Sequence, residues 1–184
     1  MATKSEIFEN HLDEHEARWF AICTPYKREK VIKSRLDKQG IVNYLPLLHL
    51  TRHYTRKAKK VELPLFNGYL FVNITYKDYI KVLQTPDVVK FVRFSGNLVS
   101  IPQNEIDLVK RVVGEGIEVR IETLGFKPGD LVEIIGGNLT GIRGKLIKEE
   151  GKQRFLVELN SLGMGLEWQI DQKLLKKINI GARL

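Results

Sequence analysis

The feature that most constrains the fold is a change of pattern partway along the chain. Up to residue 113, short apolar runs alternate with segments that have the spacing of amphipathic helices, whereas residues 126–178 hold five short β-prone runs separated by turn signals. Alternating strands and helices predict a sheet covered by helices, and many short strands predict a small barrel. A chain of 184 residues is long enough for two such domains.

From these patterns we predict four regions. Residues 1–16 are expected to form a frayed, partly disordered extension and residues 17–113 an α+β domain, followed by a linker over residues 114–124 and an all-β domain over residues 125–180. The linker holds two glycines and alternating acids, although Val119–Ile121 has the composition of a short strand.

The α+β domain is expected to have the order β-α-β-β-α-β-β-α, with helices on one face of an antiparallel sheet. Thr24 suits the N-cap and Pro25 the first position of a basic helix with Val31, Ile32 and Leu36 on its inner face. Thr75 is the expected cap of the second helix. The predicted strands cover residues 18–24, 41–50, 61–66, 69–74, 88–94 and 98–101, and the predicted helices cover residues 25–39, 76–84 and 102–113.

Basic charge is concentrated in the α+β domain. Residues 1–16 have a net charge of −4, whereas residues 17–113 carry 18 basic and seven acidic groups. A basic block of this kind is expected of a domain that meets a polyanion such as nucleic acid. A generic solvated basic surface is the alternative.

Several function classes are disfavoured. A single cysteine, Cys23, excludes an intrachain disulfide and an all-cysteine metal site. His49 and His53 have i,i+4 spacing without a third ligand, and the chain has no phosphate-binding loop, nucleophile elbow or zinc pattern. We therefore expect no enzymatic activity, no cofactor and no metal. The chain has no run of apolar residues that would cross a membrane, and its acidic start is unlike a secretory signal, so we expect a cytoplasmic protein.

Two sets of motifs carry a resemblance. The segments FKPGDLVEI (126–134) and GNLTGIRGKL (137–146) resemble the KOW motif of elongation factors and ribosomal proteins. The segments WFAI (19–22), YLP (44–46), PLFNGYLFV (64–72) and VVKFVRF (88–94) occur in the order of the N-terminal (NGN) domain of the NusG family. The resemblance covers residues 18–178 and implies an NGN domain followed by an SH3-like KOW barrel.

Within the family, the stretch from Trp19 to Phe71 is most similar to RfaH, the operon-specific branch. General members more often have F-P-G-Y where this chain has Asn67 in place of the proline. The resemblance thus implies a specialised antiterminator that acts on long exopolysaccharide or capsule operons. A housekeeping elongation and termination factor and a KOW-type RNA-binding protein of the ribosome are the alternatives.

The resemblance also implies partners for particular residues. It implies contact with the clamp helices of RNA polymerase through Phe66, Tyr69, Phe71 and Phe94. For Phe71 and Phe94, a place in the core is an equal alternative. It implies contact with non-template DNA through Tyr26, Lys27, Arg28 and Arg35, and the basic insert Arg52, Arg56, Lys57, Lys59 and Lys60 is a further candidate. Solvated basic surfaces are the alternative for both groups.

In the C-terminal domain, family members bind ribosomal protein S10 or the termination factor Rho through aromatic loop residues. The matching positions here are Leu139, Ile142 and Leu162, all aliphatic. An apolar patch for S10 is retained in this prediction, whereas the loss of aromatic anchors argues against Rho. We expect the protein to act as a monomer.

Overall fold

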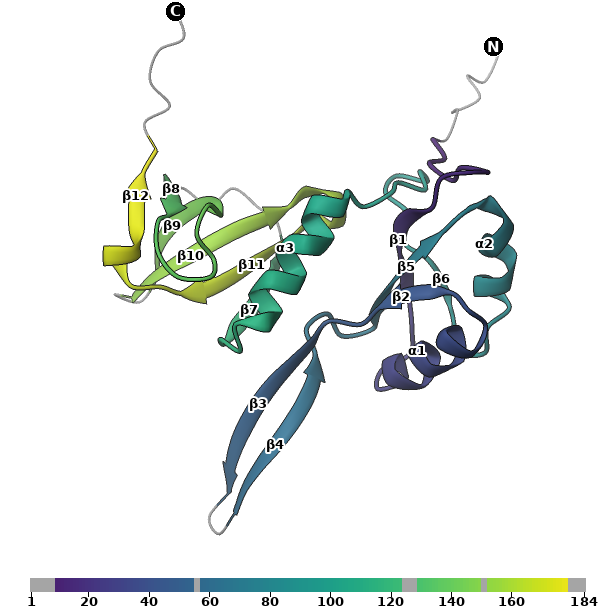
Figure 1. The fold of residues 1–184 in the computed structure, drawn as a ribbon, viewed down its shortest axis with the longest axis horizontal. Coiled ribbons are helices and arrows are strands. Elements are labelled where there is room, and N and C mark those ends of the chain that lie inside the picture. Colours follow the sequence, from purple (N-terminus) through teal and green to yellow (C-terminus); the bar gives the residue numbers. More distant parts are fainter. Residues whose placement is uncertain (1–8, 55–56, 124–128, 150–151, 179–184) are drawn as a thin grey trace, which may run out of the picture. The chain divides into compact units, whose positions relative to one another are not determined.

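The computed structural model describes residues 9–54, 57–123, 129–149 and 152–178. The chain divides into two compact units (Figure 1). The first comprises Met1–Leu47 and Phe66–Ile106, and the second comprises Leu48–Leu65 and Asp107–Leu184. No helix within these described ranges is both long and apolar enough to span a membrane.

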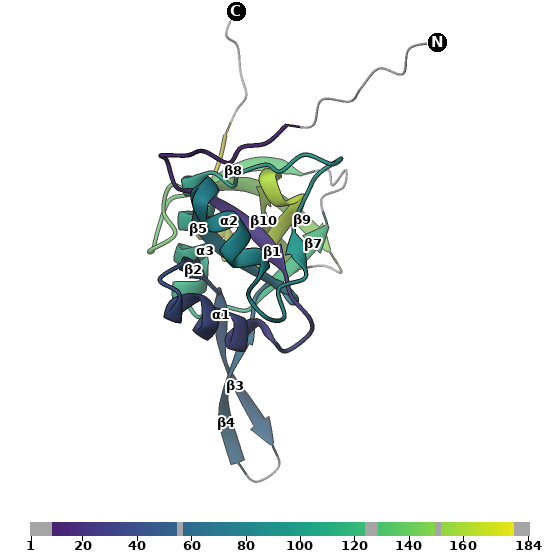
Figure 2. The same cartoon turned by 90° about the vertical axis from the view of Figure 1, so that its right-hand side faces the viewer.

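The first unit is built on a four-stranded antiparallel sheet with the order β2-β5-β1-β6. These strands are β1 (Arg18–Cys23), β2 (Val42–Tyr44), β5 (Tyr69–Ile74) and β6 (Lys90–Phe91). Helices α1 (Glu29–Lys38) and α2 (Tyr76–Leu83) lie on one side of this sheet (Figures 1 and 2). The predicted mixed fold is confirmed for this unit.

The register of β1 and β5 decides which side chains enter the core. Phe20 lies opposite Val72 and Ile22 opposite Leu70, so all four side chains point to the same face. They form one buried cluster with residues of α1, α2 and β6. Phe20 also meets Phe91 edge-on, with ring centroids 6.3 Å apart. Burial of these apolar side chains is the main stabilising term for the unit.

The start of α1 differs from the prediction. The helix begins at Glu29 and its N-cap is Arg28, not Thr24. Residues 25–28 instead form a turn closed by a hydrogen bond from Arg28 N to Pro25 O, and Lys27 has a φ of +62°. A left-handed residue is incompatible with a right-handed helix, so the helix starts only after it.

Two further details of the predicted helices are settled by the structure. Val31, placed on the inner face of α1 by the prediction, is 38% exposed, whereas Ile32 and Leu36 are fully buried. The predicted cap of α2 is confirmed: the Asp78 carboxylate accepts hydrogen bonds from the backbone N–H and hydroxyl of Thr75.

The predicted strands 88–94 and 98–101 are reduced to β6 and isolated bridges. One bridge joins Trp19 to Ile101, and another joins Asn10 to Leu98. Residues 9–16 were expected to be frayed, but the backbone of Glu9 and His11 is bonded to this edge: Leu98 N donates to Glu9 O and His11 N to Leu98 O, each at 2.9 Å.

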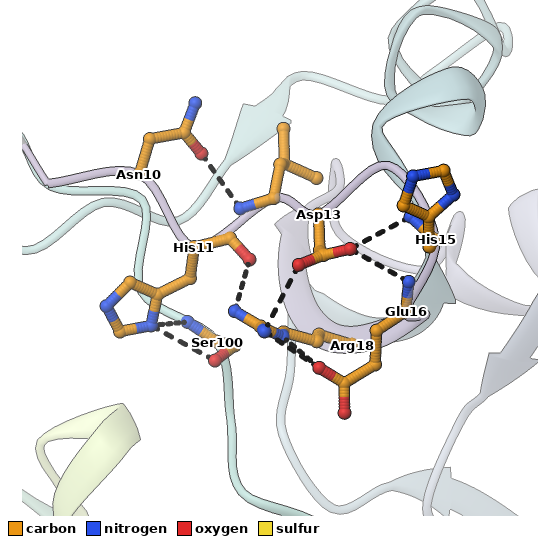
Figure 3. Close-up of polar contacts among 8 residues, drawn as sticks. Asn10, His11, Asp13, His15, Glu16, Arg18 and Ser100 are labelled. Atoms are coloured by element: carbon orange, nitrogen blue, oxygen red, sulfur yellow. Dashed lines mark hydrogen bonds and ion pairs between the residues drawn. The ribbon is translucent and has the colours of Figure 1, made fainter.

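Arg18, at the start of β1, holds the same segment through its guanidinium. This group faces the carboxylates of Asp13 and Glu16 and the carbonyl oxygen of His11 (Figure 3). Ser100 N donates to His11 Nδ1 at 3.1 Å on the other side of the segment. The side chains of His11 and Arg18 therefore hold a segment for which the sequence predicts no helix or strand.

The second unit contains two sheets and α3 (Gln103–Gly114), whose first residues belong to the first unit. The predicted strand over residues 41–50 divides at Leu45-Pro46, so that β3 (Leu47–Tyr54) pairs with β4 (Lys57–Pro64) instead. In α3, the predicted inner positions Ile106 and Val109 are buried. The third buried position is Val112 and not the predicted Val113.

The larger sheet has six antiparallel strands in the order β12-β8-β9-β10-β11-β7. They are β7 (Val119–Thr123), β8 (Asp130–Ile134), β9 (Arg143–Glu149), β10 (Lys152–Leu159), β11 (Met164–Gln169) and β12 (Leu175–Lys177). β7 lies within the predicted linker and confirms the short strand suggested by Val119–Ile121. The all-β character is confirmed, and closure into an SH3-like barrel stays a prediction.

Glycines allow the close packing of this sheet. Gly137 and Gly141 have φ values of +78° and +86° in the turn between β8 and β9, a conformation that favours glycine. Gly144 is different, because a side chain there would collide with the Leu156 carbonyl and would lie 2.8 Å from Phe155 Cζ. The strand β9 therefore lies directly against β10 at this point.

This contact predicts the effect of a single methyl group. Gly144→Ala is expected to lower the free energy of unfolding by about 1–3 kcal/mol, since the buried Phe155 and the backbone must both move. Gly114→Ala is the matched control, because a Cβ added to Gly114 would enter open space. Urea unfolding followed by circular dichroism measures both. Equal stability of the two variants would contradict the proposed close contact.

Candidate functional site

An aromatic cluster covers the sheet face opposite the core of the first unit. Ala21 and Phe71 are register partners, as are Tyr44 and Phe71, so these side chains share that face. The Tyr44 ring stacks on Phe71 with centroids 6.4 Å apart, and Phe66 meets Phe71 edge-on at 5.6 Å. Such geometries stabilise aromatic pairs beyond the area that they bury.

The members of the cluster differ in exposure. Phe66 is 3% and Phe71 1% exposed, whereas Tyr44 and Tyr69 are only partly buried. Burial raises the pKa of Tyr44 to about 12, so the phenol stays neutral at physiological pH. Phe66 and Phe71 thus form a buried base, and the two tyrosines lie at its rim with part of their surface exposed.

The structure brings together three of the four predicted aromatic residues. Phe94 lies elsewhere, in a turn where its backbone exchanges hydrogen bonds with Asn97. Tyr44 takes its place in the cluster and was not predicted as a site residue. The only sequence signal was its position in the YLP motif, one residue before the chain leaves the sheet.

A buried carboxylate positions the turn that carries these rings. Glu29 is 1% exposed, and its Oε1 accepts a hydrogen bond from Gly68 N at 2.8 Å. Gly68 has a φ of +78° and its carbonyl oxygen accepts from Thr24 N, while Tyr69 N donates to Phe66 O. The first turn of α1 is thereby linked to the turn between Phe66 and Tyr69, and the acid is favourably placed near the positive end of the helix dipole.

A second surface is formed by two adjacent loops, residues 24–28 and 86–90. Val89 N donates to Cys23 O at 2.9 Å, which holds the loops side by side. Tyr26 is 71% exposed, and Lys27 Nζ lies 4.9 Å from the centroid of its ring. An exposed ring beside cations is suited to stacking on a nucleic-acid base.

The predicted DNA-contacting arginines have an intramolecular partner. Arg28 and Arg35 both donate to Asp87 Oδ2, at 2.9 and 2.6 Å. The hydrogen bond from Arg35, followed by attraction to Arg28, holds the pKa of Asp87 below its ordinary value. Two predicted cations therefore share one anion, and the local positive charge is smaller than the sequence count suggests.

The basic insert is only partly described. Lys59 and Lys60 on β4 are exposed. Arg56 lies outside the described residues, and so do the side chains of Arg52 and Lys57. His49, considered as a metal ligand, lies 3.6 Å from Glu62, and the described part of the chain contains no cluster of metal-binding side chains.

The three aliphatic residues predicted to meet a partner of the second unit lie in its interior. Leu139 and Leu162 are each 8% exposed and Ile142 is 5% exposed. They offer little apolar surface, and their contact with another protein stays a prediction.

Comparison with known proteins matches the N-terminal part of the chain to a known family. Residues 17–110, just over half of the chain, match the family model described as transcription termination factor nusG. The transcription termination/antitermination protein NusG of Streptococcus pyogenes serotype M3 is 28% identical over 166 residues, covering 83% of this chain and 91% of its own length. The serotype M1 protein gives the same values.

A solved structure of Thermotoga maritima NusG, whose subject is domain interaction, has a similar fold. Its TM-score is 0.54 at 22% identity, and the match covers 89% of this chain and 98% of that chain. This likeness supports the fold across both units.

The contact between Glu29 and Gly68 predicts a graded response to substitution. Glu29→Ala should lower the free energy of unfolding by about 1–3 kcal/mol, because the Gly68 N–H loses its acceptor. Glu29→Gln keeps an acceptor oxygen and should be closer to wild type. Chemical denaturation gives the stabilities, and the amide proton shift of Gly68 reports the hydrogen bond. An alanine variant as stable as the glutamine variant would refute this role.

The ion pairs of Asp87 predict a pH dependence. Because the folded-state pKa of Asp87 is depressed, its stabilising contribution is present above the ordinary value of 3.8 and is lost as the pH falls through the depressed pKa. NMR titration of the carboxylate should give a midpoint below 3.8 in wild type and a higher one in Arg35→Ala. Arg93→Ala is the control, since Arg93 donates to Gly96 O and Tyr79 instead. An unchanged midpoint in Arg35→Ala would exclude the stated cause.

Proposed function

The chain belongs to the NusG family, and on this premise we propose that it binds RNA polymerase and promotes processive transcription of specific operons. It is a NusG-type transcription termination/antitermination factor, in keeping with the description of its Streptococcus pyogenes relatives. The finer proposal is that it suppresses pausing and termination on long exopolysaccharide or capsule operons.

The observation that carries the polymerase contact is the aromatic cluster of Tyr44, Phe66, Tyr69 and Phe71. Two buried rings support two partly buried tyrosines, which is the arrangement of a preorganised binding hot spot. Tyrosine loses little conformational entropy on binding and buries a large area. The clamp helices are the proposed occupant, because the family resemblance assigns them to this face.

A factor of this kind acts through binding energy alone. It would stabilise a closed clamp only to the extent that it binds the closed state more tightly than the open one. A tenfold difference between those two affinities shifts the equilibrium by about 1.4 kcal/mol. A rigid aromatic surface suits such discrimination, because its rings are packed before the partner arrives.

Nucleic acid is the proposed second partner of the first unit. Tyr26 and Lys27 are exposed on the loop of residues 24–28, and Lys90 is exposed on the neighbouring loop. Exposed cations attract DNA phosphates in a salt-dependent way. We propose that this surface meets the non-template strand, and that exposed Lys59 and Lys60 of β4 add a second basic contact.

The specialised role has separate support. Asn67, exposed at the turn before Gly68, stands where general family members more often have proline. The positions of partner-binding aromatics in the second unit hold buried aliphatic residues. Both departures favour an operon-specific antiterminator over a housekeeping factor. The aliphatic residues keep a contact with ribosomal protein S10 within the proposal, whereas the loss of aromatic anchors disfavours binding to Rho.

The polymerase contact is tested with the full-length protein and immobilised core RNA polymerase. Tyr69→Ala should weaken binding by more than about 1 kcal/mol, as the truncation of a hot-spot residue does. Tyr76→Ala is the matched control, because Tyr76 is 58% exposed on α2, on the other side of the sheet. Both affinities are measured by surface plasmon resonance.

Two outcomes would tell against the proposal. Failure of the wild-type chain to bind core polymerase would contradict the proposed function as a whole. Equal binding by the Tyr69→Ala and Tyr76→Ala variants would exclude the aromatic cluster as the polymerase-binding surface. Transcription of the neighbouring operon past a terminator, with and without the protein, then separates antitermination from a general elongation role.

A further inference from the structure

The most informative feature outside the aromatic cluster is the convergence of two arginines on one acid. Arg28 Nη2 and Arg35 Nη1 lie 2.9 and 2.6 Å from the same oxygen, Asp87 Oδ2. Arg35 Nη1 also donates to Pro86 O at 2.7 Å. Three elements supply these groups: the loop before α1, α1 itself and the loop before β6.

The backbone at Asp87 is set for this role. Its φ is +73°, a left-handed conformation that aspartate adopts more readily than most residues. The loop is held from the other side by hydrogen bonds from Val88 N to Thr85 O and from Val89 N to Cys23 O. The carboxylate is therefore presented to both arginines from a fixed point and not from a freely moving side chain.

The arrangement leaves donors available. Each guanidinium has five N–H groups, and the bonds to Asp87 and Pro86 involve only one terminal nitrogen of each. The side chains of Arg28 and Arg35 remain 47% and 34% exposed, whereas Asp87 is 27% exposed. Both arginine side chains are thus partly accessible to solvent, and Arg28 directly follows the exposed Tyr26 and Lys27 in the chain.

Electrostatics favours a second anion at this place. Two guanidinium groups drawn to one carboxylate retain a net charge of +1, and Asp87 offsets the repulsion between them. Arginine forks match the oxygens of a phosphate group and lose little further freedom when they are already held in place. The neighbouring Tyr26 ring supplies a stacking surface for a base next to that phosphate.

We propose that Asp87 is a positioning residue that holds Arg28 and Arg35 as paired donors to one backbone phosphate of single-stranded DNA. This inference rests on the proposed DNA contact and adds the group that organises it. It runs against simple charge counting, in which an acid within a DNA-binding surface weakens binding. Removal of Asp87 raises the net charge by one and yet loosens both arginines.

The sign of the effect decides between these two roles. Asp87→Gly removes the carboxylate while glycine accepts the positive φ. In full-length protein, we expect this variant to bind a fluorescently labelled single-stranded DNA of mixed sequence at least fivefold more weakly in anisotropy titrations. In an Arg28→Ala/Arg35→Ala background, Asp87→Gly should change the affinity less than twofold, because the groups that it positions are gone.

A matched control changes charge without touching the arginines. Asp37→Ala also removes an acid that is paired on α1, with Lys33 at 2.9 Å, and should leave the affinity equal or slightly tighter. Asp87→Asn tolerates the same backbone and retains one acceptor oxygen, so its loss should be smaller than that of the glycine variant. Thermal unfolding sets a temperature at which every variant is folded.

The outcomes are distinct. Unchanged or tighter binding by Asp87→Gly would overturn the inference and make Asp87 a plain counter-ion. An equal loss in the Arg28→Ala/Arg35→Ala background would overturn it as well, because Asp87 would then act independently of the arginines. Failure of the wild-type protein to bind single-stranded DNA would overturn the inference together with the DNA part of the proposed function, while the polymerase part is decided separately by the polymerase-binding measurement.

Discussion

The antiparallel pairing of β1 with β5 is the constraint on which the first unit depends. Because side chains alternate along a strand, the register that places Phe20 opposite Val72 also places Ala21 opposite Phe71. One set of residues therefore enters the core under α1 and α2, and the other set builds the aromatic face. A slip of one residue would exchange the two sets, so core stability and the proposed interface are specified by the same hydrogen bonds.

Charge in this protein is organised locally more than the sequence suggests. The excess of basic residues over residues 17–113 gives an impression of a uniformly positive domain. The structure instead pairs Arg18 with Asp13 and Glu16, Lys33 with Asp37, and two arginines with Asp87. Exposed ion pairs add little stability individually. Their greater effect is to fix the positions of the side chains that they join.

Sequence patterns predicted much of the fold and less of the site. The strand predicted over residues 18–24 and observed as Arg18–Cys23, the cap at Thr75 and the β-rich second unit follow from local signals, and the structure confirms them. The start of α1 was wrong because the left-handed Lys27 is imposed by the loop and is not visible in a Thr-Pro pair that resembles a helix start. Tyr44 and Asp87 were missed for another reason: their partners lie 27 and 52 or more residues away in the chain, and only the folded chain brings them together.

The hydrogen bond between Glu29 and Gly68 connects the two proposed binding surfaces of the first unit. Glu29 directly follows Arg28 in the chain, and its carboxylate accepts a hydrogen bond from the turn that ends at Tyr69. Together with the bond from Thr24 N to Gly68 O, it joins the loop before α1 to the turn between Phe66 and Tyr69. The proposed DNA-binding loop and the proposed protein-binding face therefore share one short stretch of hydrogen-bonded backbone.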